Sequence, residues 1–270
     1  MNKVVQLITL CFCASIFVGC TANLVAEESK ESWVEYENSA SLTALPLSNS
    51  VKWHTKSKEY QLITQGVYQQ AEQQLPVVAL QNEPWVVVMD VDETVLDNSQ
   101  YQVMVDQTDG HYTSESWASW IVAKKATLVP GAAEFMKKVY SLGGKVALVT
   151  NREKSLDAYT WENISALIPA TFENTCLLGR TQADKDAINE TSIINDKDLR
   201  RQQITNGEVV CFSEQGEQTS WQSGHTIVMQ IGDNIEDVNG ITQENANIEA
   251  LETRLYKDIF ILPNAMYGSW

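Results

Sequence analysis

The sequence has few histidines and few basic residues. Among its 270 residues are 3 histidines, 19 lysines and arginines and 35 aspartates and glutamates, which give a formal net charge of −16 at pH 7. Proteins that bind nucleic acid polymers or anionic membranes carry clusters of positive charge, and we find none here, so the composition argues against both functions. The acidity is best interpreted as a solvated surface. An anionic substrate would therefore need a metal ion and a few placed cations at its binding site.

Cysteine is also scarce, and of the 5 in the chain only Cys176 and Cys211 lie beyond residue 20. They do not suit a zinc site, because no further cysteine is available and the histidines, His54, His111 and His225, are scattered. We expect all three histidines to be structural. In an oxidising compartment the two cysteines could form a disulfide, but the sequence leaves open whether their Cα atoms come close enough.

Near the start of the chain, the apolar run from Val4 to Val18 is too short to span a bilayer comfortably and has the length of a signal-peptide core. It leads into FVGC at residues 17–20, which resembles a bacterial lipobox. Residues 1–20 are thus predicted to be a signal peptide, with Cys20 as the lipidated first residue of the mature chain. An ordinary secretory signal cleaved nearby is the alternative. No Asp follows Cys20, so we expect an outer-membrane lipoprotein facing the periplasm, or a periplasmic protein.

The rest of the chain divides into a tether and one large domain. Residues 21–50 are rich in Ser, Glu, Asn and Ala and are predicted to be a flexible tether. Residues 51–270 then form the domain, which opens with a surface helix from about Ser57 to Leu75, where apolar residues recur at helical spacing.

Within the domain, continuous apolar stretches alternate with helical patterns. This order is typical of a parallel sheet covered on both faces, a doubly wound α/β fold of Rossmann type. The predicted strands are 86–89, 145–149, 226–231 and, as a further candidate, 261–263. One predicted helix begins after Pro130-Gly131, and another spans about 155–167. A short apolar stretch lies at 176–178.

Two segments do not fit this alternation. Residues 99–129 contain several aromatic side chains and are predicted to be a small helical cap inserted after the first motif strand. Residues 179–225 form a long connection with one clear helical piece at 196–204, and residues 206–225 look inserted. Connections of this length are usually functional or insertions.

Polar residues follow three of the predicted strands at the point where each ends. Asp90 and Asp92 follow the first, Thr150 and Asn151 the second, and the stretch from Asp233 to Asp237 the third. In a doubly wound sheet these strand ends border one crevice, so we expect the side chains to converge there. Carboxylates and a hydroxyl gathered in this way suit phosphoryl transfer.

Each role follows from chemistry. Asp90 can attack phosphorus as a carboxylate nucleophile. A hard cation must then separate the two negative reactants, and Mg²⁺ prefers oxygen ligands. Asp90, Asp233 and the backbone carbonyl of Asp92 are predicted to hold it, with Asp237 acting through a water.

Two further roles concern protons and phosphoryl oxygens. The Asp92 side chain is predicted to protonate the leaving oxygen and then activate water. Thr150 and the Asn151 amide are predicted to hold the phosphoryl oxygens together with a lysine, which neutralises charge that develops on them.

The ordered motifs DVDETVLDN (90–98), TNR (150–152), a downstream lysine and GDNIED (232–237) resemble the haloacid dehalogenase (HAD) superfamily. More narrowly, the chain from about residue 50 to its end is similar to class C acid phosphatases, bacterial lipoproteins with 5′-nucleotidase activity. The resemblance implies a nucleobase held between aromatic residues, which we assign to Trp117 and Tyr267. It also favours Lys197 over Lys185 as the motif lysine, because an arginine follows three residues later.

Several alternatives compete with this interpretation. An EF-hand is disfavoured because Val95 stands where that loop needs Gly. A dehalogenase has no use for Asp92 as a second acid, and a secreted setting argues against a phosphomutase. A non-catalytic nucleotide-binding lipoprotein and a phosphatase for a sugar or vitamin phosphate remain open. The sequence predicts a Mg²⁺-dependent acid phosphatase that hydrolyses phosphomonoesters, expected to be nucleoside 5′-monophosphates, through an aspartyl-phosphate.

Overall fold

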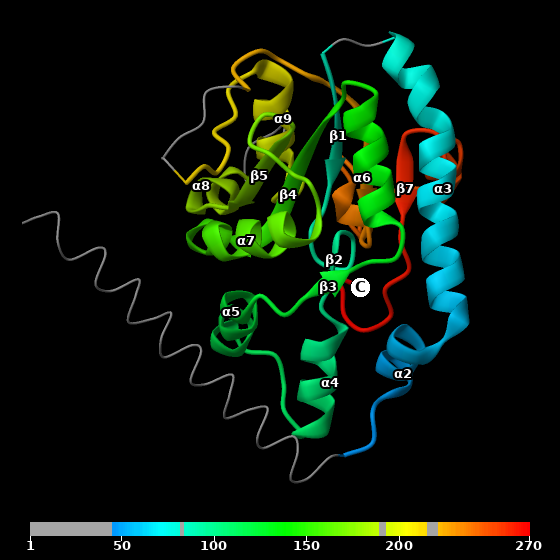
Figure 1. Cartoon of the computed structure of the whole chain (residues 1–270), viewed down its shortest axis with the longest axis vertical. Coiled ribbons are helices and arrows are strands. Elements are labelled where there is room, and N and C mark those ends of the chain that lie inside the picture. The colour runs from blue at the N-terminus through cyan, green and yellow to red at the C-terminus, as the bar shows by residue number, and fades with distance from the viewer. Residues whose placement is uncertain (1–44, 82–83, 189–192, 215–220) are drawn as a thin grey trace, which may run out of the picture.

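A five-stranded parallel sheet, in the order β5-β4-β1-β6-β7, forms the centre of the computed structural model (Figure 1). The structure describes residues 45–81, 84–188, 193–214 and 221–270. Helices cover both faces of the sheet, which confirms the predicted doubly wound α/β fold. The strands are β1 (Trp85–Met89), β4 (Lys145–Glu153), β5 (Thr175–Arg180), β6 (Thr226–Gly232) and β7 (Ile259–Ile261).

Strand β1 lies between β4 and β6, and all five of its side chains are buried. Alternate residues point to opposite faces of the sheet. Val87 and Met89 pack into a large apolar core, whereas Val86 and Val88 pack into a smaller one. The continuous apolar run that predicted this strand is thus explained by burial on both faces.

The helices that pack into the large core include α3 (Lys58–Gln81), α6 (Ala132–Ser141) and α7 (Asp157–Leu167). Helix α3 continues past Leu75, where the sequence predicted its end, and contains Pro76. Proline usually interrupts a helix. Here Leu75 is fully buried in the large core, whereas Pro76 is exposed.

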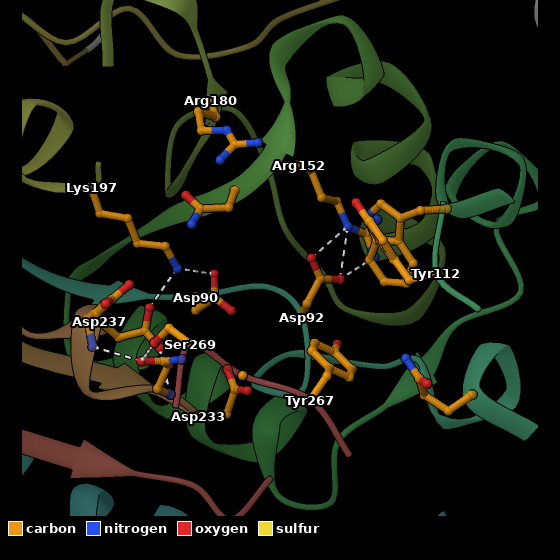
Figure 2. Close-up of a pocket in the computed structure, with 16 residues that line it drawn as sticks. Asp90, Asp92, Tyr112, Arg152, Arg180, Lys197, Asp233, Asp237, Tyr267 and Ser269 are labelled. Carbon is orange, nitrogen blue, oxygen red and sulfur yellow. Dashed lines mark hydrogen bonds and ion pairs between the residues drawn. The ribbon is translucent and has the colours of Figure 1, made fainter. Parts of the chain in front are cut away.

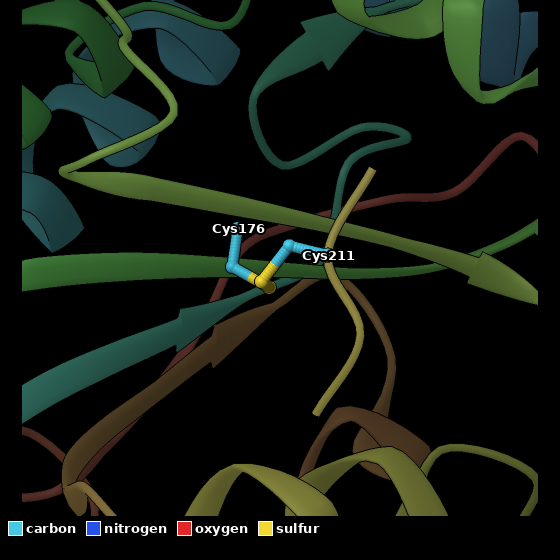
Figure 3. Close-up of a disulfide and its surroundings, with 2 residues drawn as sticks. All are labelled: Cys176 and Cys211. Atoms are coloured by element: carbon cyan, nitrogen blue, oxygen red, sulfur yellow. A yellow bond between two sulfur atoms is a disulfide. The ribbon is translucent and has the colours of Figure 1, made fainter. Parts of the chain in front are cut away.

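The smaller core lies under α9 (Asp198–Asn206) and the loop that follows it. In that loop Cys211 forms a disulfide with Cys176 of β5, with the two Cα atoms 5.0 Å apart (Figure 3). The segment that looked inserted is therefore bonded covalently to the sheet. The fully buried Trp221 fills the same core.

The segment predicted to be a cap leaves the sheet after β1. It contains α4 (Ser99–Gln107) and α5 (Ser114–Ala123), which lie between the short antiparallel strands β2 (Leu96–Asp97) and β3 (Thr127–Leu128) (Figure 1). The backbone N–H of Ser48, next to α2 (Asn49–Lys56), donates a hydrogen bond to Asp106 of α4 at 2.7 Å.

Three helices were not predicted: α2, which begins within the predicted tether, α8 (Gln182–Ala187), within the long connection, and α10 (Ile248–Glu252). Among the helices that the structure describes, none is long and apolar enough to cross a membrane. The predicted signal peptide with Cys20, and the predicted tether up to residue 44, lie outside the described residues.

Candidate active site

The ends of β1, β4 and β6 open into a cavity of about 460 Å³ (Figure 2). Residues at the strand ends, of the predicted cap and of the C-terminal segment line it. Of the residues predicted from the sequence, the cavity is lined by Asp90, Asp92, Trp117, Asn151, Lys197, Asp233, Asp237 and Tyr267.

The buried amine of Lys197 lies at the floor of the cavity. Its Nζ is 2.5 Å from Asp90 Oδ1 and 2.6 Å from Asp237 Oδ1. The alternative lysine, Lys185, instead donates to Glu153 at 2.9 Å on the surface. Of the two lysines that the sequence left open, only Lys197 reaches the predicted nucleophile.

Three carboxylates surround a point near this amine. One oxygen each from Asp90, Asp233 and Asp237 lies within 4.8 Å of the others. Burial raises the pKa of Asp90 to about 7 despite the opposing effect of Lys197, and burial with Asp237 and Asp90 nearby raises the pKa of Asp233 well above its usual range. One lysine does not balance three carboxylates, and an all-oxygen donor set fits a hard divalent cation.

Local structure fixes two of these carboxylates. Asp237 ends the 3₁₀ turn η2 (Ile235–Asp237), and its Oδ2 accepts the N–H of Asn234 at 3.0 Å. A Cβ at Gly232 would lie 1.9 Å from that oxygen, so glycine is required at the end of β6. On the other side, Asn264 Nδ2 donates to Asp233 Oδ2 at 2.8 Å.

Asp92 lies apart from this group and faces Arg152 (Figure 2). Arg152 donates to Asp92 Oδ1 from Nη2 at 2.6 Å and from Nε at 3.0 Å, and Asn98 Nδ2 donates to the same oxygen at 2.9 Å. The sequence predicted no role for Arg152 or Asn98. Both occur within the quoted motifs, but their partners lie on other strands and loops, which a motif alone does not show.

Thr150 and Asn151, at the end of β4, are placed differently from each other. Asn151 is exposed at the cavity, where its Oδ1 accepts from Arg200 at 3.3 Å. Thr150 is fully buried behind the lining residues, and its Oγ1 accepts the N–H of Arg152 at 3.2 Å.

Aromatic side chains form the opposite wall. Trp117 packs edge-on against Tyr101 with ring centroids 5.0 Å apart, and the guanidinium of Arg152 lies 5.7 Å from the Trp117 ring. The phenol of Tyr267 donates to Glu93 Oε1 at 2.7 Å. Further lining residues that sequence reasoning missed are Gln102, Tyr112, Arg180 and Ser269.

Carboxylates and a lysine at converging strand ends define a site suited to phosphoryl transfer, since they can supply a nucleophile, a cation site and charge neutralisation together. A family model of the HAD superfamily, subfamily IIIB (acid phosphatase), matches residues 18–270. The chain belongs to this family and is therefore an acid phosphatase, a phosphoric monoester hydrolase. Phosphatases of this superfamily use a divalent metal, and the oxygen donors described above fit one.

Solved structures agree with this assignment at the level of fold. Two structures of the class C acid phosphatase from Bacillus anthracis, one with tungstate bound, each share 24% sequence identity and a TM-score of 0.65 with this chain. Each match covers 82% of this chain and 84% of the other.

Proposed function

We propose that this acid phosphatase is Mg²⁺-dependent and hydrolyses nucleoside 5′-monophosphates through an aspartyl-phosphate on Asp90. One observation carries the proposal: the cavity has a charged wall, with Asp90 and Lys197, and an aromatic wall, with Trp117 and Tyr267. A phosphoryl group suits the first wall. A planar base suits the second, because bases stack well on Trp and Tyr.

The charged wall supports a two-step reaction. Lys197, at 2.5 Å from Asp90 Oδ1, orients this carboxylate and neutralises charge on the phosphoryl oxygens, with the Asn151 amide as a further donor. Thr150, which was also predicted to bind these oxygens, is buried behind the lining and supports Arg152 instead. Asp90 forms a bond to phosphorus as the bond to the leaving oxygen breaks, and Asp92 donates a proton to that oxygen. Asp92 then removes a proton from the water that hydrolyses the aspartyl-phosphate.

A divalent cation has a defined place in this scheme. Asp90, Asp233 and the backbone carbonyl of Asp92 would hold it, with Asp237 acting through a water. When bound, Mg²⁺ would supply charge neutralisation between the carboxylates and the anionic substrate. The excess of three carboxylates over one lysine in this group supports its presence.

The test is phosphate release by residues 21–270 from a nucleoside monophosphate, with Mg²⁺ or with EDTA, beside Asp90→Asn. We expect EDTA and the substitution each to lower turnover by at least about 10³-fold. The exposed Asp109 supplies the control Asp109→Asn, which should keep wild-type turnover. A folded Asp90→Asn variant with near-wild-type turnover would contradict the nucleophile assignment. Faster release from a sugar or vitamin phosphate than from nucleotides would contradict the proposed nucleotide substrate.

We further propose that Cys20 is lipidated and that the enzyme is anchored to the outer membrane, facing the periplasm. The Cys176–Cys211 disulfide supports this placement, because disulfides persist in oxidising compartments. The test is incorporation of labelled fatty acid into the full chain in bacteria. Label that persists in Cys20→Ser would reject the assignment.

A further inference from the structure

Glu93 is a buried carboxylate that the proposed chemistry does not use. It follows Asp92 directly, its side chain is fully buried, and its backbone has φ 55°. Residues other than glycine rarely adopt this left-handed conformation, and it persists only where the surroundings enforce it. The contacts that Glu93 makes therefore suggest what this conformation achieves.

One contact joins Glu93 to the aromatic wall of the cavity. The phenol of Tyr267 donates to Glu93 Oε1 at 2.7 Å, and Tyr267 lines the cavity. Two more hydrogen bonds hold the same C-terminal segment: Asn264 to Asp233 at 2.8 Å and Ser269 Oγ to Asn234 Oδ1 at 3.1 Å. Of the three, only the bond to Glu93 fixes a side chain that faces the proposed base site.

A second contact joins Glu93 to the acid/base residue. The backbone N–H of Asn98 donates to both Glu93 oxygens, at 3.1 and 3.2 Å. The Asn98 side chain then donates to Asp92 at 2.9 Å and accepts from Trp120 Nε1 at 2.7 Å. The side chain of Glu93 thus fixes the residue whose amide orients Asp92.

One further neighbour of Glu93, His54, does not line the cavity. His54 Nε2, on α2, is 3.8 Å from Glu93 Oε2 and 3.6 Å from Asp97 Oδ1. Because the Glu93 side chain is fully buried, its hydrogen bonds to Tyr267 and Asn98 are shielded from water. Hydrogen bonds that are shielded from water are electrostatically stronger than exposed ones.

We propose that Glu93 is a positioning residue that acts on both walls of the cavity. It anchors Tyr267 so that the ring forms a fixed substrate wall, and it holds Asn98 so that Asp92 keeps its orientation. The first effect concerns substrate binding and rests on the proposed nucleotide specificity. The second concerns turnover of any phosphomonoester.

Two substitutions separate the effects. Tyr267→Phe keeps the ring and removes only the anchor, so KM for a nucleoside monophosphate should rise about 3- to 10-fold with kcat within about twofold. Glu93→Gln disturbs both contacts, because its amide would face the N–H of Asn98 or the phenol of Tyr267. Glu93→Gln should raise KM for the nucleotide by a similar factor. It should also lower kcat at least about tenfold, and this loss should be the same for the nucleotide and for a small aryl phosphate.

The experiment is a double-mutant cycle of Glu93→Gln and Tyr267→Phe, with kcat and KM measured on both substrates. We expect the KM effect of Tyr267→Phe to vanish when Gln occupies position 93. Tyr140→Phe is the matched control, since its phenol pairs with Thr175 at 2.8 Å away from the cavity, and it should leave KM unchanged. Additive KM effects, or a kcat for Glu93→Gln no lower than for Tyr267→Phe, would overturn the proposal.

Two other results also decide the matter. If Glu93→Gln does not fold, judged by circular dichroism, Tyr267→Phe beside Tyr140→Phe still tests the anchor, and equal KM values for the two would reject it. If the wild type releases phosphate from other monoesters but not from nucleotides, the proposed substrate is wrong. The cycle is then measured on the preferred monoester, where the loss of kcat in Glu93→Gln still reports the Asn98 contact.

Discussion

Two clusters of buried charged residues lie side by side in this enzyme and differ in the ratio of acidic to basic side chains. The site cluster consists of Asp90, Asp233, Asp237 and Lys197. The α9 cluster consists of Asp184, Asp198, Arg200 and Arg201. Lys197 and Asp198 are adjacent in sequence, so the two clusters meet at the start of α9.

In the α9 cluster each carboxylate has its own arginine. Arg201 pairs with Asp198 at 2.6 Å and Arg200 with Asp184 at 3.2 Å. Arg200 Nη1 also donates to the backbone carbonyls of Thr150 and Leu178, at 2.5 and 2.9 Å. The α9 cluster therefore ties its helix to the ends of β4 and β5, and this fixes where Lys197 lies.

The site cluster has three carboxylates and one lysine, and burial raises the pKa of Asp90 to about 7. Residues of the same type thus have different functions. A charge in a balanced pair cannot be removed without leaving its partner buried and uncompensated, whereas the unbalanced carboxylates themselves cost stability and leave a place for a cation. This contrast predicts that substitutions in the two clusters change stability in opposite directions.

The largest expected effect is on turnover, from Asp233→Asn. Losing this ligand should lower phosphate release by at least about 10³-fold with Mg²⁺ present. The same change removes a buried carboxyl group that lies next to Asp90, and the side-chain oxygen of the new residue can still accept from Asn264. We therefore expect the metal-free variant to be more stable than the wild type by about 1 kcal/mol, measured as urea unfolding in EDTA.

Metal binding supplies an independent check on Asp233→Asn. Mn²⁺ should raise the Tm of the wild type and not that of the variant, because ligands that bind only the folded state stabilise it. If the variant is less stable than the wild type in EDTA and Mn²⁺ still raises its Tm, the carboxylates of the site cluster are not in excess, and their charges are compensated as in the α9 cluster.

The next largest effect is expected in the α9 cluster, from Arg201→Met. This change leaves Asp198 buried beside a neutral side chain and should lower the free energy of unfolding by about 3–5 kcal/mol in urea titrations. The matched control is Arg254→Met, because Arg254 pairs with Asp258 at 2.6 Å on the surface and should cost less than about 1 kcal/mol. Equal costs for the two variants would mean that burial of the pair is unimportant.

The sequence predicted the site better than it predicted the connections around it. Asp90, Asp92 and Asp233 could be placed because strand ends in a parallel sheet converge, whatever the loops do. Glu93, Asn98 and Arg152 could not be assigned roles, since their partners come from distant segments. For the same reason the sequence left the pairing of Cys176 with Cys211 open.

Helix ends and short helices were predicted least well. Pro76 would normally mark an end, but packing of α3 on the large core outweighs that local preference. Helix α8 has 6 residues, too few for a clear apolar periodicity. Its capping box of Thr181 and Asp184 was a usable sequence signal, but Thr–Asp pairs at this spacing are common in loops too.

A third effect concerns Asp157, a buried carboxylate that belongs to neither cluster. Burial raises its pKa to about 7, against about 3.9 in an unfolded chain. The folded state therefore binds this proton more tightly, and its contribution to the free energy of unfolding falls as pH rises from about 4 to about 7. Asp157→Asn should gain about 1–3 kcal/mol relative to the wild type across this range, measured by urea unfolding at several pH values.

Since other carboxyl groups titrate in the same range, the useful quantity is the difference between Asp157→Asn and the wild type at each pH. Asp109→Asn, at an exposed position, should show no such pH-dependent difference. If the difference in free energy of unfolding between Asp157→Asn and the wild type is the same at every pH, burial does not perturb the Asp157 carboxyl group in the way proposed.

The smallest effect tests whether the aromatic wall acts separately from the site cluster. Trp117→Ala should raise KM for a nucleoside monophosphate about tenfold and KM for a small aryl phosphate less than about threefold, because stacking on a base contributes about 1–3 kcal/mol. Trp53→Ala removes a partly buried Trp that packs on Tyr60 away from the cavity, and it should change neither value. An equal rise for both substrates would make Trp117 a packing residue of the cap, and the charged wall alone would then select the substrate.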